Sequence, residues 1–161
     1  MTSIGFIGTG LMGLPMATNL AKSGFQLKAF NRSIGKADPL KKLGVEISKT
    51  LSEVIKDNDF IITMLTDDMA VNAIMENPDF LSNLKSGSTV IDMSSIKPIT
   101  ATKYGNKFKS KNIYYLDAPV SGGTIGAEEA SLAIMVGGEQ SVFDNSLNIL
   151  KAMGNPTLVG P

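Results

Sequence analysis

The chain has 161 residues and a hydrophobic fraction of 43%, which fits a single domain with a core of ordinary size. Fifteen Lys and Arg balance fifteen Asp and Glu, so the sequence lacks the basic patch that a nucleic-acid-binding protein requires. It contains no His and no Cys, which excludes disulfides, thiol nucleophiles, imidazole bases and zinc sites of the Cys/His type. No apolar run approaches the ~18 residues that cross a bilayer, so we expect a cytoplasmic protein without membrane or nucleic-acid partners.

The first predicted element is a short buried strand from Ile4 that leads directly into a glycine-rich turn and a helix. The turn is a G-x-G-x-x-G on Gly8, Gly10 and Gly13, and a second apolar run, Phe25–Phe30, follows the helix. In such a unit the first glycine makes the tight turn, the second lets the backbone approach a pyrophosphate, and the third lets the helix pack on the strand. The helix N-terminus offers free N–H groups and a positive dipole end to phosphates. This context favours dinucleotide binding over a merely structural turn.

Asn31, Arg32 and Ser33 follow the second apolar run, where a dinucleotide-binding unit often carries an acid for the ribose 2′-hydroxyl. An acid would repel a 2′-phosphate, whereas the planar guanidinium of Arg32 can bind one, and Ser33 and Lys36 can add donors. The sequence therefore favours NADP over NAD. The alternative is that Arg32 is simply a solvated residue at a strand end.

Short helices and strands alternate through the next part of the chain. The expected elements are a helix over 36–43, a strand over 45–47, a helix over 50–57 capped by Thr50 or Ser52, and a strand over 59–65 buried on both faces.

The residues after that strand lie where the carboxyl ends of parallel strands face the ligand crevice. Leu65 and Thr66 are therefore expected beside the ribose and nicotinamide half of a cofactor. Asp67 and Asp68 are adjacent carboxylates at the start of a helix, and we expect them to cap it, with metal binding as the alternative.

The second half of the chain continues the alternation. It predicts strands over 88–93, 112–117, 131–136 and 157–159, and helices over 99–110 and 139–152, the latter with Val142, Phe143, Leu147 and Leu150 facing inward. The hydroxyls of Ser94 and Ser95 could reach the nicotinamide ring or cap the helix that follows. This order of elements predicts a doubly wound α/β domain, a mostly parallel sheet with helices on both faces, the first strand near its centre and the Gly8 turn at the switch point.

Small residues cluster between Asp117 and Gly123 without a simple turn to explain them all. The hydroxyl of Ser121 beside the N–H groups of Gly122 and Gly123 would form a compact anion-binding nest, which suits a carboxylate.

Taken together, these motifs resemble the β-hydroxyacid dehydrogenase family over the whole chain. The motifs that carry the resemblance are residues 5–13 (GFIGTGLMG), 15–17 (PMA), 19–20 (NL), 31–33 (NRS), 117–123 (DAPVSGG) and 135–138 (MVGG). The family includes 3-hydroxyisobutyrate dehydrogenase, tartronate semialdehyde reductase, glyoxylate/succinic semialdehyde reductase and, more distantly, 6-phosphogluconate dehydrogenase.

The resemblance implies a Rossmann-type domain in which Leu65, Thr66 and Ser95 contact the cofactor. It also implies that the Ser121–Gly123 segment holds the carboxylate and hydroxyl end of the substrate. The full set of expected cofactor-binding residues is Gly8, Gly10, Leu11, Met12, Gly13, Asn31, Arg32, Ser33, Lys36, Leu65, Thr66 and Ser95, and the expected substrate-binding residues are Ser121, Gly122 and Gly123.

Two positions depart from the family pattern, and one element of it is absent. Thr124 stands where 6-phosphogluconate enzymes tend to carry an acid, which favours a small hydroxy acid over a sugar phosphate, and Ala130-Ser131 replaces a common Gly followed by Thr or Lys. In the family a lysine on a long helix beyond the nucleotide domain is the general acid and base, with an asparagine one turn later. Because this chain ends at Pro161, we expect residues 1–161 to be the NADP-binding domain, with the catalytic lysine and the helical catalytic and dimerisation domain lying beyond it.

The expected function is therefore that of the cofactor-binding domain of an NADP-dependent 3-hydroxyacid dehydrogenase or small aldehyde reductase. Hydride would pass between the nicotinamide and a small hydroxy acid or aldehyde acid, such as glyoxylate or succinic semialdehyde, in a full-length form expected to be a homo-oligomer. The alternatives are an imine reductase, against which the 117–123 motif argues, and a non-catalytic nucleotide-sensing module.

Overall fold

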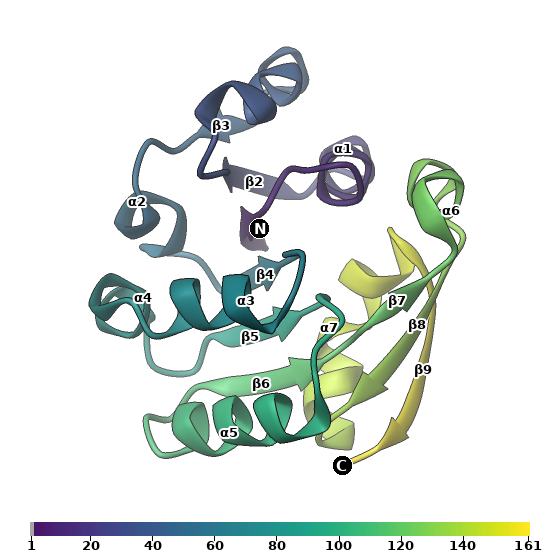
Figure 1. Ribbon diagram of the computed structural model, residues 1–161. Coiled ribbons are helices and arrows are strands. Elements are labelled where there is room, and N and C mark those ends of the chain that lie inside the picture. Colours follow the sequence, from purple (N-terminus) through teal and green to yellow (C-terminus); the bar gives the residue numbers. More distant parts are fainter. Residues whose placement is uncertain (1) are drawn as a thin grey trace.

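The structure is a computed structural model that describes residues 2–161, except for the side chain of Ile34. A sheet crosses the molecule with helices packed on both of its faces (Figure 1). Its parallel part has the order β3-β2-β1-β4-β5-β6, which confirms the predicted doubly wound α/β class. These strands are β1 (Ser3–Ile7), β2 (Gln26–Phe30), β3 (Glu46–Ile47), β4 (Phe60–Thr63), β5 (Thr89–Asp92) and β6 (Tyr114–Asp117).

The order of the strands reverses at β1, which has β2 on one side and β4 on the other. Ile7, the last residue of β1, lies opposite Phe30 of β2 and Thr63 of β4. The carboxyl ends of the three strands therefore meet at one edge of the sheet. In open parallel sheets such a switch point forms the crevice in which ligands bind, and the Gly8 turn lies there as predicted.

An antiparallel extension completes the sheet beyond β6. It consists of β7 (Val120–Ser121), β8 (Leu132–Gly137) and β9 (Gly154–Gly160). β8 runs antiparallel to β6 and β7, and β9 pairs parallel to β8 at the outer edge. β9 is longer than the predicted strand over 157–159, and it tolerates Pro156 because a proline is accommodated on an edge strand.

The helices bury two apolar clusters, one on each face of the sheet. One face carries α1 (Gly13–Lys22), the 3-10 helix η1 (Ile34–Leu43), α6 (Gly123–Glu129) and α7 (Gln140–Lys151). The other carries α2 (Leu51–Ile55), α3 (Asp68–Met75), α4 (Pro78–Asn83) and α5 (Pro98–Lys109). Consecutive residues of β4 divide between the clusters, because Ile61 packs in one and Ile62 in the other. This is the burial on both faces that the apolar run predicted.

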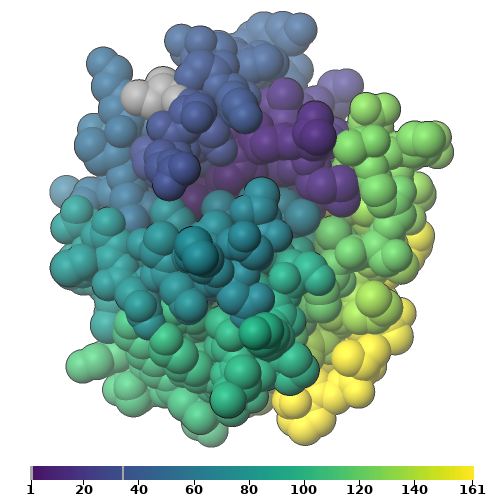
Figure 2. Space-filling model, in the orientation of Figure 1, coloured from purple at the N-terminus to yellow at the C-terminus, as the bar shows by residue number. Residues whose placement is uncertain are grey.

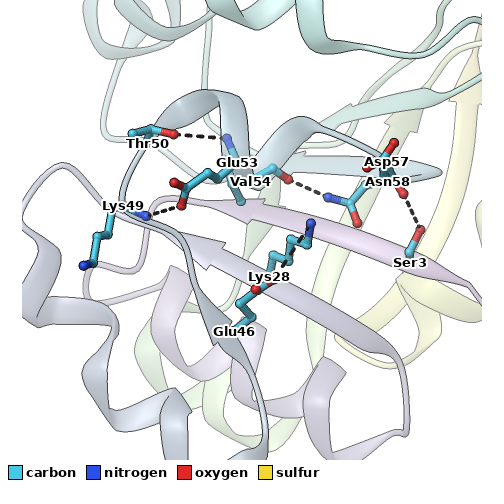
Figure 3. Close-up of polar contacts among 9 residues, drawn as sticks. All are labelled: Ser3, Lys28, Glu46, Lys49, Thr50, Glu53, Val54, Asp57 and Asn58. Atoms are coloured by element: carbon cyan, nitrogen blue, oxygen red, sulfur yellow. Dashed lines mark hydrogen bonds and ion pairs between the residues drawn. The ribbon is translucent and has the colours of Figure 1, made fainter.

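The helix α2 begins with a side-chain cap (Figure 3). Thr50 accepts a hydrogen bond from the N–H of Glu53 at 3.2 Å, and the Glu53 carboxylate accepts one from the N–H of Lys49 at 3.0 Å. These bonds satisfy N–H groups that a helix start leaves free. Of the two predicted caps, Thr50 is therefore correct. After the helix, the Asn58 side chain donates to the carbonyl of Val54 at 2.6 Å, which holds the chain as it turns into β4.

Some helices also differ from the sequence-based expectation. The segment predicted as a helix over 36–43 begins at Ile34 and is a 3-10 helix, with Pro39 inside it. Proline has no N–H for the α-helical bond, so a regular α-helix is disfavoured there. The helices α4 and α6 were not predicted, and α6 starts at consecutive glycines, which have low helix propensity.

Candidate cofactor and substrate site

Two glycines of the turn after β1 are required by the packing of the protein itself. Gly8 has a φ of 105°, and a Cβ there would lie 2.1 Å from the carbonyl oxygen of Met64. A Cβ on Gly13 would lie 1.7 Å from the carbonyl oxygen of Gly8. No side chain fits at either distance, so both glycines bring the turn, α1 and β4 into close contact. This agrees with the turn and packing roles that the motif predicts for its first and third glycines.

Gly10 differs from the other two glycines because nothing in the protein requires it. It is exposed, and a Cβ built on it would meet no atom within 4 Å. The neighbouring Leu11 is 85% exposed, and Leu11 and Met12 donate no main-chain hydrogen bond to the residues that the structure describes. The helix α1 also begins without a side-chain cap at Met12. An open glycine beside free N–H groups is the arrangement that an approaching phosphate needs.

A hollow of about 540 Å³ lies beside this turn. Its walls come from the turn and the start of α1, from η1 through Lys36 and Pro39, and from α6 through Thr124 and Glu128. In Figure 2 the purple surface of the N-terminal turn lies between the blue surface that follows β2 and the green surface around α6. The hollow thus brings predicted cofactor residues (Gly10, Leu11 and Lys36) beside the helix that follows the Ser121–Gly123 segment.

Asn31 connects the glycine turn to the end of β2. Its Oδ1 accepts a hydrogen bond from the N–H of Thr9 at 3.0 Å, and its Nδ2 donates to the carbonyl of Ser33 at 3.0 Å. Asn31 therefore shapes the site as well as bordering it. Arg32, Ser33 and Lys36 are exposed, and their side chains form no hydrogen bond or ion pair with the described residues. Their donors are thus available to a ligand at the end of β2.

The loops after β4 and β5 lie at the same edge. Leu65 is half-buried and donates its N–H to Oγ of Ser94 at 2.8 Å, while Thr66 and Ser95 are exposed. Of the two alternatives for Ser94 and Ser95, capping of the following helix is wrong. That helix, α5, begins after Lys97 without a side-chain cap and has Pro98 in its first turn. Ser94 and Ser95 precede Lys97, which occupies the cap position, and the Ser94 hydroxyl accepts from the N–H of Leu65 instead.

The two adjacent aspartates at the start of α3 have separate partners. Asp67 caps α3, because its Oδ1 accepts from the N–H of Ala70 at 2.9 Å. Asp68 instead accepts from the N–H of Lys97 at 3.1 Å and from Oγ1 of Thr100 at 2.7 Å. The capping interpretation is therefore confirmed for Asp67 only. Through its two bonds, Asp68 joins the first turn of α3 to the start of α5.

The Ser121–Gly123 segment joins β7 to α6 and is exposed throughout. Gly122 has a φ of 138° and Gly123 a φ of 62°, values that other residues rarely adopt. A Cβ on Gly122 would also lie 3.3 Å from Leu132, whereas one on Gly123 would meet nothing within 4 Å. The two glycines thus give the backbone a conformation that only this residue type supplies readily. The consecutive N–H groups beside the Ser121 hydroxyl remain candidates for holding an anion.

Buried acids lie at the carboxyl ends of β5 and β6. Asp92 is fully buried and lies opposite Asp117 in the sheet register. Burial raises the pKa of Asp92, and burial together with the charge of Asp92 raises the pKa of Asp117 to about 6. Burial and both carboxylates raise the pKa of the Tyr115 hydroxyl as well. Sequence reasoning missed Asp92, because its importance depends on which strands are neighbours.

Within residues 2–161, no helix combines the length and the apolar character that crossing a membrane requires. Across the same residues, the acids of the chain form no group of three that could hold a metal ion.

Comparison with known proteins identifies the family. The matching family model describes the NAD binding domain of 6-phosphogluconate dehydrogenase, and it matches residues 3–160. The chain belongs to this family. The resemblance of its motifs to the β-hydroxyacid dehydrogenases, of which 6-phosphogluconate dehydrogenase is a distant member, is thereby confirmed.

Individual members of the family are similar over the whole of this NAD-binding domain. The chain is 44% identical over 161 residues to 2-hydroxy-3-oxopropionate reductase of Escherichia coli, and the matched region covers 98% of the chain and 54% of that protein. A solved structure of Mycobacterium tuberculosis 3-hydroxyisobutyrate dehydrogenase with L-serine superposes with a TM-score of 0.94 at 33% identity, over 99% of this chain and 55% of that one. The chain thus spans about half the length of these relatives.

An imine reductase from Myxococcus stipitatus in complex with NADP+ also superposes, with a TM-score of 0.91 over 99% of this chain and 55% of that one. At 24% identity, this likeness shows the shared fold alone.

Proposed function

We propose that this chain is the cofactor-binding domain of an NADP-dependent 3-hydroxyacid dehydrogenase or small aldehyde reductase. The observation that carries the proposal is the contrast within the glycine turn. Gly8 and Gly13 are packed against main-chain atoms, while Gly10 between them faces open space beside free N–H groups. A turn with only a structural role would have no need of an open glycine at its middle position.

The preference for NADP rests on the end of β2. No acid stands at residues 31–33, and the exposed Arg32, Ser33 and Lys36 offer hydrogen-bond donors there. Arg32 would bind a 2′-phosphate through two parallel N–H groups, and Lys36 would add a positive charge. Asn31 would hold this segment next to the glycine turn through its bond to Thr9.

The substrate we propose is a small hydroxy acid or aldehyde acid. Ser121, Gly122 and Gly123 would hold its carboxylate through a hydroxyl and consecutive N–H groups, and the adjoining α6 lines the same hollow as the glycine turn. The nicotinamide supplies the hydride chemistry, while the protein orients the two partners. A carboxylate nest of this kind favours hydroxy acids over the imines of the alternative hypothesis.

In the resemblance to the β-hydroxyacid dehydrogenases, none of the lysines of residues 1–161 occupies the position of the family's general acid and base. We therefore expect residues 1–161 alone to bind the cofactor and to turn over substrate very slowly, because loss of general acid–base catalysis typically costs ~10² to 10⁴ in rate. Turnover by this chain at ordinary dehydrogenase rates would contradict that assignment.

Nuclear magnetic resonance tests the binding site directly. Addition of NADPH to the labelled chain should shift amide signals in the glycine turn, in the Asn31–Lys36 segment and in the loops after β4 and β5. Addition of a small hydroxy acid to the resulting complex should shift the amide signals of Gly122 and Gly123. Shifts confined to other regions would contradict the proposal.

A further inference from the structure

A series of buried and partly buried hydrogen bonds joins the loops that follow β4 and β5. Oδ1 of Asp92 accepts from Oγ1 of Thr63 at 2.9 Å and from the N–H of Ser94 at 3.1 Å. Oγ of Ser94 in turn accepts from the N–H of Leu65 at 2.8 Å. Oδ1 of Asp92 therefore bonds to the last residue of β4 and to the loop after β5. The bond between Ser94 and Leu65 extends this connection to the loop after β4.

This connection begins where the main-chain ladder between the two strands stops. Thr63 and Asp92 are the last residues of β4 and β5 in register, and the N–H of Met93 still donates to the carbonyl of Thr63 at 2.8 Å. One step further, the acceptor for the N–H of Leu65 is a side chain, Oγ of Ser94. The serine hydroxyl thus replaces a carbonyl as the two loops diverge.

The burial of these groups makes the connection rigid. Thr63, Asp92 and Ser94 are each fully buried. A buried polar group that loses its partner stays unsatisfied, so such bonds are costly to break and fix their members in one arrangement. Asp92 is an unusual choice for this position, because a charged group is seldom fully buried. Its second oxygen, Oδ2, is also buried and has no partner among the described residues.

The loops joined in this way lie on the opposite side of β1 from Arg32. β2, which ends at Phe30 just before Arg32, pairs with one edge of β1, and β4 followed by β5 lies beyond the other edge. A dinucleotide that crosses the glycine turn with its adenine half at β2 places its nicotinamide half against the loops after β4 and β5. The exposed Thr66 and Ser95 belong to these two loops.

We infer that Asp92 is a positioning residue, which acts through Ser94 to hold the Leu65–Thr66 and Ser94–Ser95 loops in the one arrangement that receives the nicotinamide half of the cofactor. This inference rests on the proposed function, because it assumes that a dinucleotide binds across the switch point. It makes a selective prediction. Loss of the connection weakens contacts to the nicotinamide half and leaves those to the adenine half as they were.

Titration calorimetry of the 161-residue chain with two ligands tests this selectivity. NADPH reaches both halves of the site, whereas 2′,5′-ADP contains only the adenine half with its phosphates. Ser94→Ala removes the acceptor of the Leu65 N–H, and Asp92→Ala removes the acceptor of both the Thr63 hydroxyl and the Ser94 N–H. Ser94→Ala should bind NADPH about fivefold more weakly, the size expected for one lost hydrogen bond, and Asp92→Ala at least as much more weakly. Both variants should bind 2′,5′-ADP within about twofold of the parent.

The matched control is Ser146→Ala. Ser146 is also fully buried, and its hydroxyl donates to the carbonyl of Val142 at 2.9 Å inside α7, away from both loops. This variant loses a buried hydroxyl of the same kind and should bind both ligands as the parent does. Circular dichroism establishes that each variant is folded at the temperature of the titration, and if Asp92→Ala does not fold, Ser94→Ala decides alone.

The possible outcomes separate the two proposals. If the parent chain binds neither ligand, the proposed function fails. If the parent binds both, but Ser94→Ala binds NADPH as tightly as the parent or loses affinity for both ligands equally, the positioning role of Asp92 is overturned while the proposed function stands.

Discussion

The side-chain amide of Asn19 donates a hydrogen bond to the carbonyl oxygen of Ala127 at 2.7 Å, which joins α1 to the last turn of α6. The last carbonyls of a helix have no partner within the helix, and α6 ends at Glu129, which is followed by Ala130 in the left-handed conformation. Asn19 supplies a donor to these carbonyls from a neighbouring helix, and its Nδ2 also donates to the carbonyl of Glu128 at 3.4 Å. Because α1 follows the glycine turn and α6 follows the Ser121–Gly123 segment, these bonds fix the proposed cofactor and substrate sites relative to each other.

Asn19→Ala is therefore expected to destabilise the chain by about 1 kcal/mol, the usual contribution of one hydrogen bond. Urea unfolding followed by circular dichroism measures the change. Asn148→Ala is the matched control, because Asn148 is exposed on α7 and the same replacement there removes no bond to the described residues. Equal stability of the two variants would show that the link between α1 and α6 contributes nothing.

The two kinds of glycine in the turn predict different effects of an alanine substitution on stability. Gly13→Ala places a Cβ 1.7 Å from the carbonyl oxygen of Gly8, and such overpacking should cost about 1 to 3 kcal/mol. Gly10→Ala places a Cβ in open space and should leave the free energy of unfolding within about 0.5 kcal/mol of the parent. Thermal unfolding compares the pair, and a large loss of stability in Gly10→Ala would contradict the assignment of Gly10 to ligand binding.

Cofactor preference is expected to depend on Arg32. One charge-assisted hydrogen bond contributes ~1.5 to 3 kcal/mol, so Arg32→Ala should lower the affinity for NADPH by roughly 10- to 150-fold with little change for NADH. Lys151→Ala, which removes an exposed charge at the end of α7, is the control. A parent chain with equal affinities for the two cofactors would show that the end of β2 does not select NADP.

The pKa of Asp117 predicts a pH dependence of stability. Because its pKa rises from 3.8 to about 6 in the folded protein, the folded state holds this proton more tightly than the unfolded state. Its contribution to stability is therefore complete below about pH 4 and is lost as the pH rises through about 6. The group is half-buried, so solvent screening reduces the loss to about 1 kcal/mol.

Asp117→Asn removes this titration. Its stability relative to the parent should increase between pH 4 and pH 7, as measured by urea unfolding at several pH values. A difference between Asp117→Asn and the parent that is independent of pH would contradict the raised pKa.

The sequence predicted those parts of the fold that depend on local patterns. The apolar run from Phe60 indicated β4 with both faces buried, and the glycine motif placed the turn after β1. The start of α6 was missed because Gly122 and Gly123 have low helix propensity. Close packing on β8 defines this helix instead, since a Cβ on Gly126 would lie 3.1 Å from the side chain of Leu132.

In the candidate site, too, local sequence motifs could be predicted, whereas contacts between residues far apart in the sequence could not. Gly8, Gly10 and Gly13 follow from their spacing and from the strand and helix patterns on either side of them. The bonds of Asn31 to Thr9 and of Ser94 to Leu65 cross 22 and 29 residues, and they depend on which strands are neighbours in the sheet. For the same reason the sequence left the role of Ser94 open between cofactor contact and helix cap, and no local pattern indicated Asp92.

The most direct test of the proposed cofactor site is a calorimetric titration of the 161-residue chain and its Gly10→Val variant with NADPH. Gly10 faces open space, so valine there fills the volume that the pyrophosphate requires while the fold stays intact by circular dichroism. We expect saturable binding of one NADPH per parent chain and no measurable binding to the variant. Absence of binding to the parent, or equal affinity in the folded variant, would contradict the claim that this turn holds a dinucleotide.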